Sequence, residues 1–393
     1  MDAPRVTALR LREILEPACR AHGVELCGVV GLPRRLPHAA AWFDWLLKGK
    51  HGELAYLLRA PQDRADPTRE RPWARTLLVF GQRYTAGWPA RDEPGDGGWT
   101  LGVARYARGL DYHDVLRGAI RRITGALRRE LHRTGVIAAE ADLRAVDAVD
   151  AGPFLEREHA WLAGLGFFGK NTLLIHPRLG SGLFLGVALL ELEVTGLADA
   201  PRPLVGPPAQ RLSGQYLPDA DGMASLCGSC SLCQDSCPTG ALDTPFELDA
   251  RRCLATWSIE WQGRAPADRR ALQGDRLFGC DICQQVCPWN HKALRRPAAT
   301  PPSPGYDVLP EHAEVDLGDL IGMDAEAFRE RFRRTPLWRA HPEGMRRNAL
   351  IVAANTGRRD LLPAIREAAA GDPDAEVREV AVWALAELEE APS

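Results

Sequence analysis

Apolar residues recur with two different spacings in the first half of the chain. Helical spacing around Leu9, Ile14 and Leu15 predicts a helix, and a longer one is predicted over 111–133, with Asp111 as its N-cap. A third helical pattern covers 42–58 and is interrupted by glycines at 49–52. Short apolar runs predict strands at 24–30, 77–80, 146–149, 173–175 and 183–192. Mixed helices and strands of this kind predict an α+β sandwich domain over residues 1–198.

The second half is organised differently. Residues 199–222 are rich in proline and glycine and predict an irregular connector before a cysteine-rich domain at 223–295. Residues 296–393 begin with a proline-rich linker, and helices are predicted at 345–356, 361–370 and 375–388. The last helix is expected to start with Asp372 as N-cap and Pro373 at its first position. Helices of this length in succession indicate a HEAT-like helical repeat.

Composition narrows the class of protein. The chain has 393 residues, of which 45% are hydrophobic and 26% charged, as in soluble proteins of two or three domains. No apolar run approaches the roughly 18 residues typical of a membrane span, and no signal-peptide pattern is seen near Met1. We therefore expect a cytoplasmic protein with no membrane contact, and nothing in the sequence demands more than a monomer.

Eight of the ten cysteines fall within 61 residues. The first four have the spacing C-x2-C-x2-C-x3-C-P, which is typical of bacterial ferredoxins, where the fourth thiolate binds the other cluster. A second run, C-x2-C-x3-C-P, begins at Cys280, and Cys253 lies between the two runs. Eight thiolates match two [4Fe–4S] clusters. The expected ligand sets are Cys227, Cys230, Cys233 and Cys287 for one cluster, and Cys237, Cys253, Cys280 and Cys283 for the other.

The alternative for these motifs is structural zinc, which paired CxxC sequences often bind. The run of four cysteines and its final proline favour iron–sulfur clusters. Cys19 and Cys27 lie on predicted core elements and are expected to be small buried apolar residues. Two adjacent clusters conduct single electrons, so the large N-terminal domain is expected to hold whatever receives them.

The densest polar stretch of that domain is VDAGPFLER at 149–157, followed by the glycine-rich AGLGFFGKN at 163–171. A strand that ends in an acid and is followed by a proline turn can build one wall of a pocket. Asp150 could then have a raised pKa and act as a general acid, or it could cap the helix that follows. The pattern alone leaves both interpretations open.

These two blocks resemble the family of epoxyqueuosine reductases, cobalamin-dependent enzymes of the last step of queuosine synthesis in tRNA. ARYARGLDYH at 104–113 and GCDICQQVCPWN at 279–290 resemble two further blocks of that family. The resemblance implies a cobalamin-binding N-terminal domain holding cob(II)alamin, and Asp150 as the proton donor. The residues that it places around the corrin are Arg64, Asp111, Tyr112, His113, Asp150, Lys170 and Asn171.

The reaction that the resemblance implies removes an epoxide oxygen from a base in a tRNA anticodon loop, with electrons from an external donor. Because the net charge is only −3, binding to tRNA would need a local basic patch. Residues 329–359 contain nine arginines against Glu330 and Glu343, a net charge of +7. Arg346 and Arg347 are the predicted tRNA contacts. The alternative is a solvated helix face.

Three other functions remain open at this point. One is a reductive dehalogenase, which also combines a corrin with two clusters but resembles exported, membrane-tethered proteins. Another is an electron carrier with a cobalamin-trafficking domain and no catalysis of its own. In a third, the C-terminal helices dock a protein rather than RNA.

Overall fold

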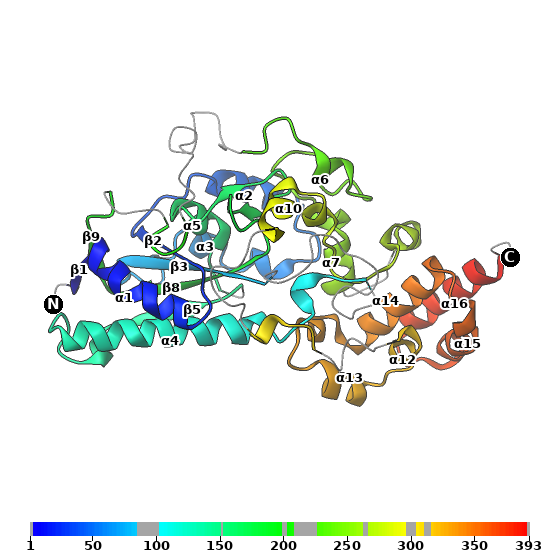
Figure 1. Cartoon of the computed structure of the whole chain (residues 1–393). Helices are drawn as coiled ribbons and strands as arrows, with labels where there is room; N and C mark the ends of the chain where they lie inside the picture. Colours follow the sequence, from blue (N-terminus) through cyan, green and yellow to red (C-terminus); the bar gives the residue numbers. More distant parts are fainter. Residues whose placement is uncertain are drawn as a thin grey trace.

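The computed structural model describes residues 3–84, 102–150, 152–198, 203–207, 226–261, 266–295, 304–309 and 316–390. The N-terminal α+β part and the C-terminal helices lie at opposite ends of the molecule (Figure 1). The cysteine-rich segment, which contains α6, α7 and α10, lies between them. None of the described helices is long and apolar enough to cross a membrane.

A four-stranded antiparallel sheet is the centre of the N-terminal part. Its strand order is β2 (Leu26–Gly31), β3 (Thr76–Arg83), β8 (Leu183–Leu190) and β5 (Ala145–Ala148). Three short pairs lie outside it: β1 (Arg5–Thr7) with β9 (Glu193–Thr195), β4 (Gly102–Val103) with β10 (Arg276–Phe278), and β6 (Phe167–Phe168) with β7 (Leu174–Ile175). The predicted strands are therefore confirmed, with their ends shifted by a few residues.

Helices cover both faces of the sheet. Side chains alternate along β3, so that Leu78 and Phe80 face one cluster of buried residues while Leu77 and Val79 face another. The first cluster includes α1 (Ala8–Ala21) and α4 (Tyr112–Arg133), and the second includes α5 (Glu156–Leu162). The predicted 42–58 helix is shorter than expected: α2 (Ala39–Leu47) ends before the glycines, and short turns follow at Ala55–Leu58 (η1) and Pro61–Ala65 (α3).

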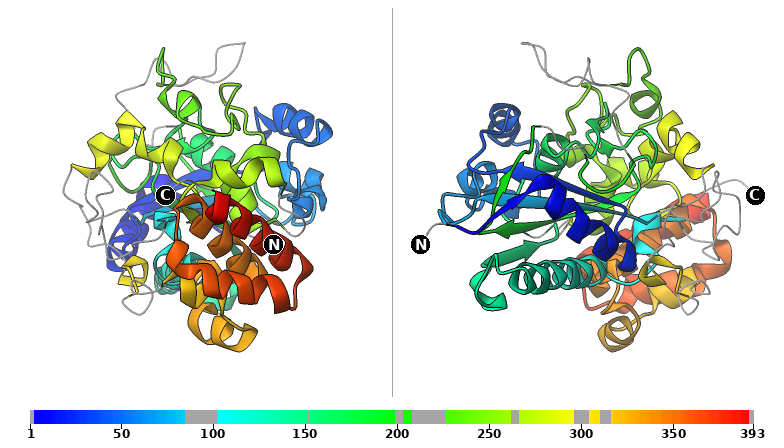
Figure 2. Two further views of the ribbon diagram at one scale, coloured as in Figure 1. Left: turned by 90° about the vertical axis from the view of Figure 1, so that its right-hand side faces the viewer. Right: turned by 60° about the vertical axis from the view of Figure 1, so that its left-hand side comes forward.

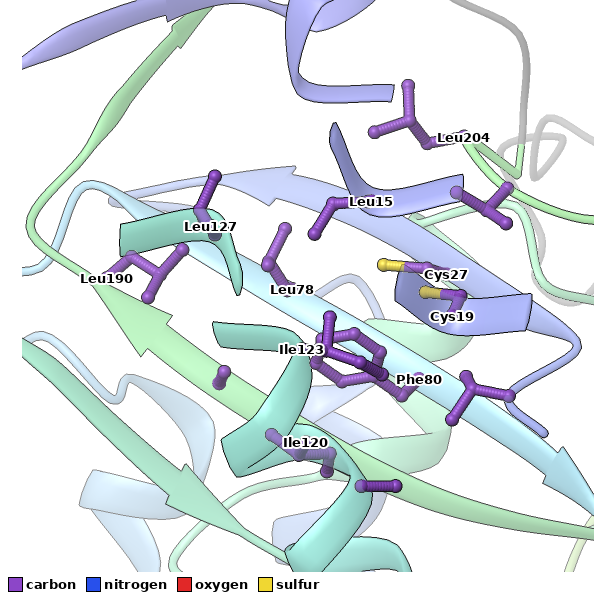
Figure 3. Packing of buried hydrophobic residues seen from close by; sticks show 14 of the residues in the cluster. Leu15, Cys19, Cys27, Leu78, Phe80, Ile120, Ile123, Leu127, Leu190 and Leu204 are labelled. Atoms are coloured by element: carbon purple, nitrogen blue, oxygen red, sulfur yellow. The ribbon is translucent and has the colours of Figure 1, made fainter. Parts of the chain in front are cut away.

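Cys19 and Cys27 are fully buried in the first cluster. Figure 3 shows their sulfur atoms close together among Leu15, Leu78 and Phe80. The prediction that they are core residues is confirmed.

The cysteine-rich segment consists of short elements: α6 (Leu232–Asp235), α7 (Leu254–Ile259), α8 (Ala267–Arg270), β10, α9 (Ile282–Gln285) and α10 (Pro288–Leu294). Polar side chains between and just after its last cysteines attach it to the N-terminal part. The backbone N–H of Arg105 donates to Asp281 (2.6 Å), and that of Ser181 donates to Asn290 (2.7 Å). This explains why the 279–290 block contains specific polar residues besides its cysteines.

The C-terminal helices are α12 (Leu317–Ile321), α13 (Ala325–Phe332), α14 (His341–Asn355), α15 (Leu362–Gly371) and α16 (Ala375–Glu390). A 3-10 turn, η8 (Pro336–Ala340), leads directly into α14. In the orange and red end of the chain in Figure 2, α16 packs against both α14 and α15. Helix α16 begins at Ala375, as predicted, but the predicted N-cap is wrong, because Asp374 rather than Asp372 accepts the N–H groups of Glu376 and Val377.

The prediction that Arg346 and Arg347 contact tRNA is also wrong. Both side chains are buried, with exposed fractions of 8% and 3% for the residues. Arg346 forms two hydrogen bonds with Asp372 (2.7 and 3.1 Å), and Arg347 donates to backbone carbonyls of the cysteine-rich segment. A run of arginines in sequence does not distinguish a solvated face from guanidinium groups that satisfy buried oxygen atoms.

Arg346→Ala should destabilise the protein by about 3–5 kcal/mol, because it leaves the buried carboxylate of Asp372 without its cation. Urea unfolding followed by circular dichroism measures this loss. Arg366→Ala is the matched control, because its partner Glu389 and Arg366 itself are more than half exposed, and such pairs contribute less than about 1 kcal/mol. Equal losses in the two variants would contradict the buried-pair assignment.

Candidate active site and cysteine clusters

The N-terminus of α4 presents two functional side chains. Asp111 caps the helix, as predicted, by accepting the N–H of His113 at 2.9 Å, and it also contacts Nδ1 of His113 at 2.7 Å. The cap places Tyr112 and His113 in the first helical turn. The Tyr112 ring stacks on Phe184 of β8 with 4.4 Å between centroids, which fixes the position of its hydroxyl.

Asp150 lies opposite this helix end, two residues after β5. Its Oδ2 accepts a 2.5 Å hydrogen bond from the hydroxyl of Tyr112 and lies 3.6 Å from Nε2 of His113. Its φ of +55° is in the left-handed region, which aspartate tolerates better than most residues. Half of the side-chain surface remains accessible to solvent, so a substrate can approach the carboxylate.

Two ionisable side chains hold the Asp150 loop. The N–H of Asp150 donates to Oε1 of Glu156 (2.7 Å), and Arg64 donates through Nη1 to the carbonyl of Gly152 (2.9 Å). Helix α5 begins at Glu156 with Leu155 as its N-cap, so the alternative that Asp150 caps this helix is wrong. Glu156 was not among the predicted site residues, although it is part of the VDAGPFLER block.

The pKa of Asp150 differs from the expectation. Partial burial raises it, but hydrogen bonds from His113 and Tyr112, helped by the charges of His113 and Arg339, outweigh this effect and lower the pKa to about 2. The expectation of a raised pKa is therefore wrong. Burial alone would lower the pKa of His113, but its hydrogen bonds to Asp111 and Asp150 raise it to about 9. The proton of this pair resides on His113 at neutral pH.

A cation from the C-terminal part completes the group. Arg339 of η8 lies with Nη1 3.7 Å from Oδ2 of Asp150 and Nη2 2.6 Å from Oε1 of Glu260. Sequence reasoning missed this residue. It counted Arg339 only as one of nine arginines, and no local motif indicated that 339 and 150 would meet.

Lys170 and Asn171 lie against the cysteine loops. Nζ of Lys170 donates to the carbonyls of Gly228 (2.8 Å) and Cys230 (2.9 Å), and Nδ2 of Asn171 lies 3.4 Å from the carbonyl of Cys283. These contacts hold the cysteine-bearing loops against the N-terminal part. Contact of either residue with a corrin stays a prediction.

All eight clustered cysteines lie in described segments, and none is in a disulfide. A cavity of about 210 Å³ is lined by Cys227, Cys230, Cys233 and Cys287, the four that were predicted to share a cluster. Lys170, Lys292 and Trp289 also line it. Burial, followed by the neighbouring thiols Cys227 and Cys287, raises the pKa of Cys233 to about 11.

The thiols of the other predicted set act on one another electrostatically. Burial raises the pKa of Cys283, and Cys280 and Cys253 raise it further. Burial and Cys237 likewise raise the pKa of Cys253. Thiols that raise one another's pKa are suited to a cationic iron centre, which favours the thiolate. Cys233 also acts on Cys283, so the two sets are neighbours.

Comparisons with known proteins agree with this arrangement. Residues 226–290 match a family described as a 4Fe-4S double cluster binding domain, and residues 64–141 match "Epoxyqueuosine reductase QueG, DUF1730". An epoxyqueuosine reductase of Xanthomonas campestris pv. campestris is 32% identical over 98% of this chain and 97% of its own. One from Synechococcus sp. is 35% identical over 86% and 94%.

Solved structures give the same picture. This chain superposes with a TM-score of 0.76 and 26% identity, over 97% of its length and 91% of the other, on an epoxyqueuosine reductase crystallised with an epoxyqueuosine-modified tRNA stem loop. A Bacillus subtilis epoxyqueuosine reductase, described with its aspartate-bearing catalytic loop swung out of the active site, gives the same score.

The double-cluster segment beside a polar site defines an iron–sulfur oxidoreductase with two [4Fe–4S] clusters. Within that class, the chain belongs to the epoxyqueuosine reductase family.

The ion pair of Asp150 and His113 makes stability depend on pH in a defined direction. The lowered pKa of Asp150 contributes stability above about pH 4, and the raised pKa of His113 contributes stability below about 6.5 that is lost as the pH rises through about 9. His113→Gln should therefore be less stable than the wild type near pH 6, and the difference should shrink toward pH 9–10.

Urea unfolding at several pH values measures this difference. The same substitution in an Asp150→Asn background is the control, and there the pH dependence should be weaker. A difference that grows with pH in the wild-type background would contradict the assignment of the proton to His113.

Proposed function

We propose that this chain reduces epoxyqueuosine to queuosine in the anticodon loop of tRNA, with cobalamin bound in the N-terminal domain. The observation that carries this proposal is the half-exposed Asp150 carboxylate held by Tyr112, His113 and Arg339 next to two sets of cluster cysteines. An electron carrier without catalysis would have no need of such a proton-bearing group. Membership of the family supports the same reaction.

The residues around Asp150 fit a corrin with polar side groups. Burial raises the pKa of the Tyr56 hydroxyl to about 12, and the negative charge of Asp150 contributes to this increase. The buried Nε of Arg64 has no hydrogen-bond partner among the described residues, so it is a donor left for a further group. Arg64, Asp111, Tyr112 and His113 would hold the cofactor from this side.

Bound cobalamin would supply a reduced cobalt centre, fed with single electrons through the two clusters. Loss of the epoxide oxygen as water consumes two electrons and two protons and leaves an alkene. His113, which holds the proton at rest, passes it to the Asp150 carboxylate. Asp150 then delivers the proton to the epoxide oxygen. Glu156 is a second source of a proton, because burial and the charge of Asp150 raise its pKa to about 8. Excluding water from this group keeps the proton for the substrate.

An external one-electron donor would deliver its electrons to the cluster held by the cysteine set that contains Cys227. The cavity of this set is lined by residues with accessible surface, including Leu232 and Lys292. The C-terminal helices would form the HEAT-like repeat that the sequence suggested. A loop base is already partly unstacked, so placing it over Asp150 costs little.

Asp150→Asn should keep both clusters and cobalamin but lose about 100- to 10,000-fold in turnover, because an amide cannot deliver the proton. The assay follows the loss of one oxygen from the nucleoside by mass spectrometry after anaerobic incubation of a modified stem loop with a reductant. Asp147→Asn is the matched control, since Asp147 pairs with Arg117 and Arg121 away from the site. Full activity of Asp150→Asn would refute the role of Asp150.

The tRNA surface must use other arginines than those first predicted. Arg333 and Arg334 are exposed, and the carbonyl of Arg334 accepts the N–H of Asp111 (2.8 Å), so both lie beside the site. Phosphate contacts there would guide an anticodon loop toward Asp150.

Replacing Arg333 and Arg334 with glutamine should weaken binding of the stem loop and flatten its salt dependence by about one to two units of slope. Fluorescence anisotropy at several salt concentrations measures both. Arg366→Gln, at the far end of the C-terminal helices, is the control and should leave the slope unchanged. An unchanged slope in the double variant would exclude this surface.

A further inference from the structure

Buried hydrogen bonds from α14 join the C-terminal helices to the cysteine-rich segment. Arg347 donates to the carbonyls of Trp257 and Trp261, both at 3.0 Å. Nδ2 of Asn348 donates to the carbonyls of Ser258 (2.7 Å) and Leu277 (3.0 Å). Both side chains are buried. These bonds fix α14 to the C-terminal end of α7 and to β10.

The same contact carries Arg339 to the active site. Arg339 belongs to η8, which runs directly into α14, and its partner Glu260 is the residue that ends α7. From there its guanidinium reaches Asp150 of the N-terminal part. The Arg339 side chain therefore connects the C-terminal helices, the cysteine-rich segment and the N-terminal part at the Asp150 carboxylate, on which the proposed reaction depends.

We propose that Arg339 is a positioning residue of the active site, which holds the Asp150 carboxylate in place and makes its proton balance depend on the docked C-terminal helices. This inference rests on the proposed function. It assigns a role in the chemistry to a part of the chain that the sequence connected only with helical repeats and RNA.

The groups that face Asp150 show why this cation matters. Tyr112 and His113 face it from α4, with Asp111 behind them, and Glu156 faces it from α5. The charge of Asp150 also acts on Tyr56, Tyr106 and Arg157, and Arg157 of α5 donates its hydrogen bonds to Thr172 rather than to Asp150. Arg339 approaches from η8 with Glu260 as its partner. His113 can lose its charge, whereas a guanidinium stays charged throughout the working pH range.

Removing Arg339 should therefore make the Asp150–His113 pair hold its shared proton more tightly. An opposite charge within about 4–6 Å commonly lowers the pKa of a carboxyl group by 1–3 units, and the half-exposed side chain places the expected effect at the lower end. The proton is shared, so the shift belongs to the pair rather than to one residue.

The test compares Arg339→Gln, Arg339→Lys and the wild type, each loaded with clusters and cobalamin, on the modified stem loop. The alkaline limb of kcat/KM should move to higher pH by about one unit in Arg339→Gln, and kcat at the optimum should fall about tenfold. Arg339→Lys keeps the charge and should keep the limb near its wild-type position. The His113 imidazole, followed by NMR in protein with labelled histidine and assigned with His113→Gln, should titrate at higher pH in Arg339→Gln.

Arg329→Gln is the matched control, because it removes the same charge from the same part of the chain, where Arg329 contacts only the exposed Glu326 at 3.6 Å among the ion pairs described. It should move neither the limb nor the titration. An unchanged limb and titration in Arg339→Gln, or an equal shift in Arg329→Gln, would overturn the inference. Absence of turnover in the wild type would instead refute the proposed function, and the NMR titration would still decide the role of Arg339.

Discussion

The carboxylate of Asp150 is held by partners from distant parts of the chain, and the arrangement of the molecule around it follows from this constraint. Tyr112 and His113 come from the capped end of α4, and Arg339 comes from the turn before α14. Glu156, from the helix after the loop, holds the backbone N–H of Asp150. Partners of opposite charge keep the group ionised in the resting state. A proton is nevertheless one contact away, on His113, which suits a reaction that consumes protons.

The cysteine-rich segment is the structural link between the two ends of the molecule. Asp281 and Asn290 attach it to the N-terminal part, while the carbonyls of Trp257 and Ser258 receive the side chains of Arg347 and Asn348. The loops that carry the cluster ligands are therefore held from both sides. Electron transfer depends steeply on distance, so such bracing favours a constant path from the clusters to the site.

Local patterns predicted much of the fold and part of the site. The short apolar run of β3, the helical spacing in α4 and the cap at Asp111 depend on neighbours within a few residues, and each prediction was confirmed. The cysteine spacing was similarly informative, because cluster ligands are constrained by short loops. By contrast, the cap of α16 was assigned to the wrong acid of its loop, since Asp372 is taken up by the distant Arg346 and leaves Asp374 to accept the N–H groups of the first turn.

The sequence by itself determined which residue types could do the chemistry: eight thiols at ferredoxin spacing and an aspartate after a strand. Only the tertiary structure decided their electrostatic state and their partners. A sequence does not report burial. Arg346 and Arg347, which were expected to form an RNA surface, are buried and donate hydrogen bonds to carboxylate and carbonyl oxygens. The contact between residues 339 and 150 arises from how three parts of the chain pack. The pKa of Asp150 is lowered by His113 and Tyr112 first and then by Arg339, none of which is its neighbour in sequence.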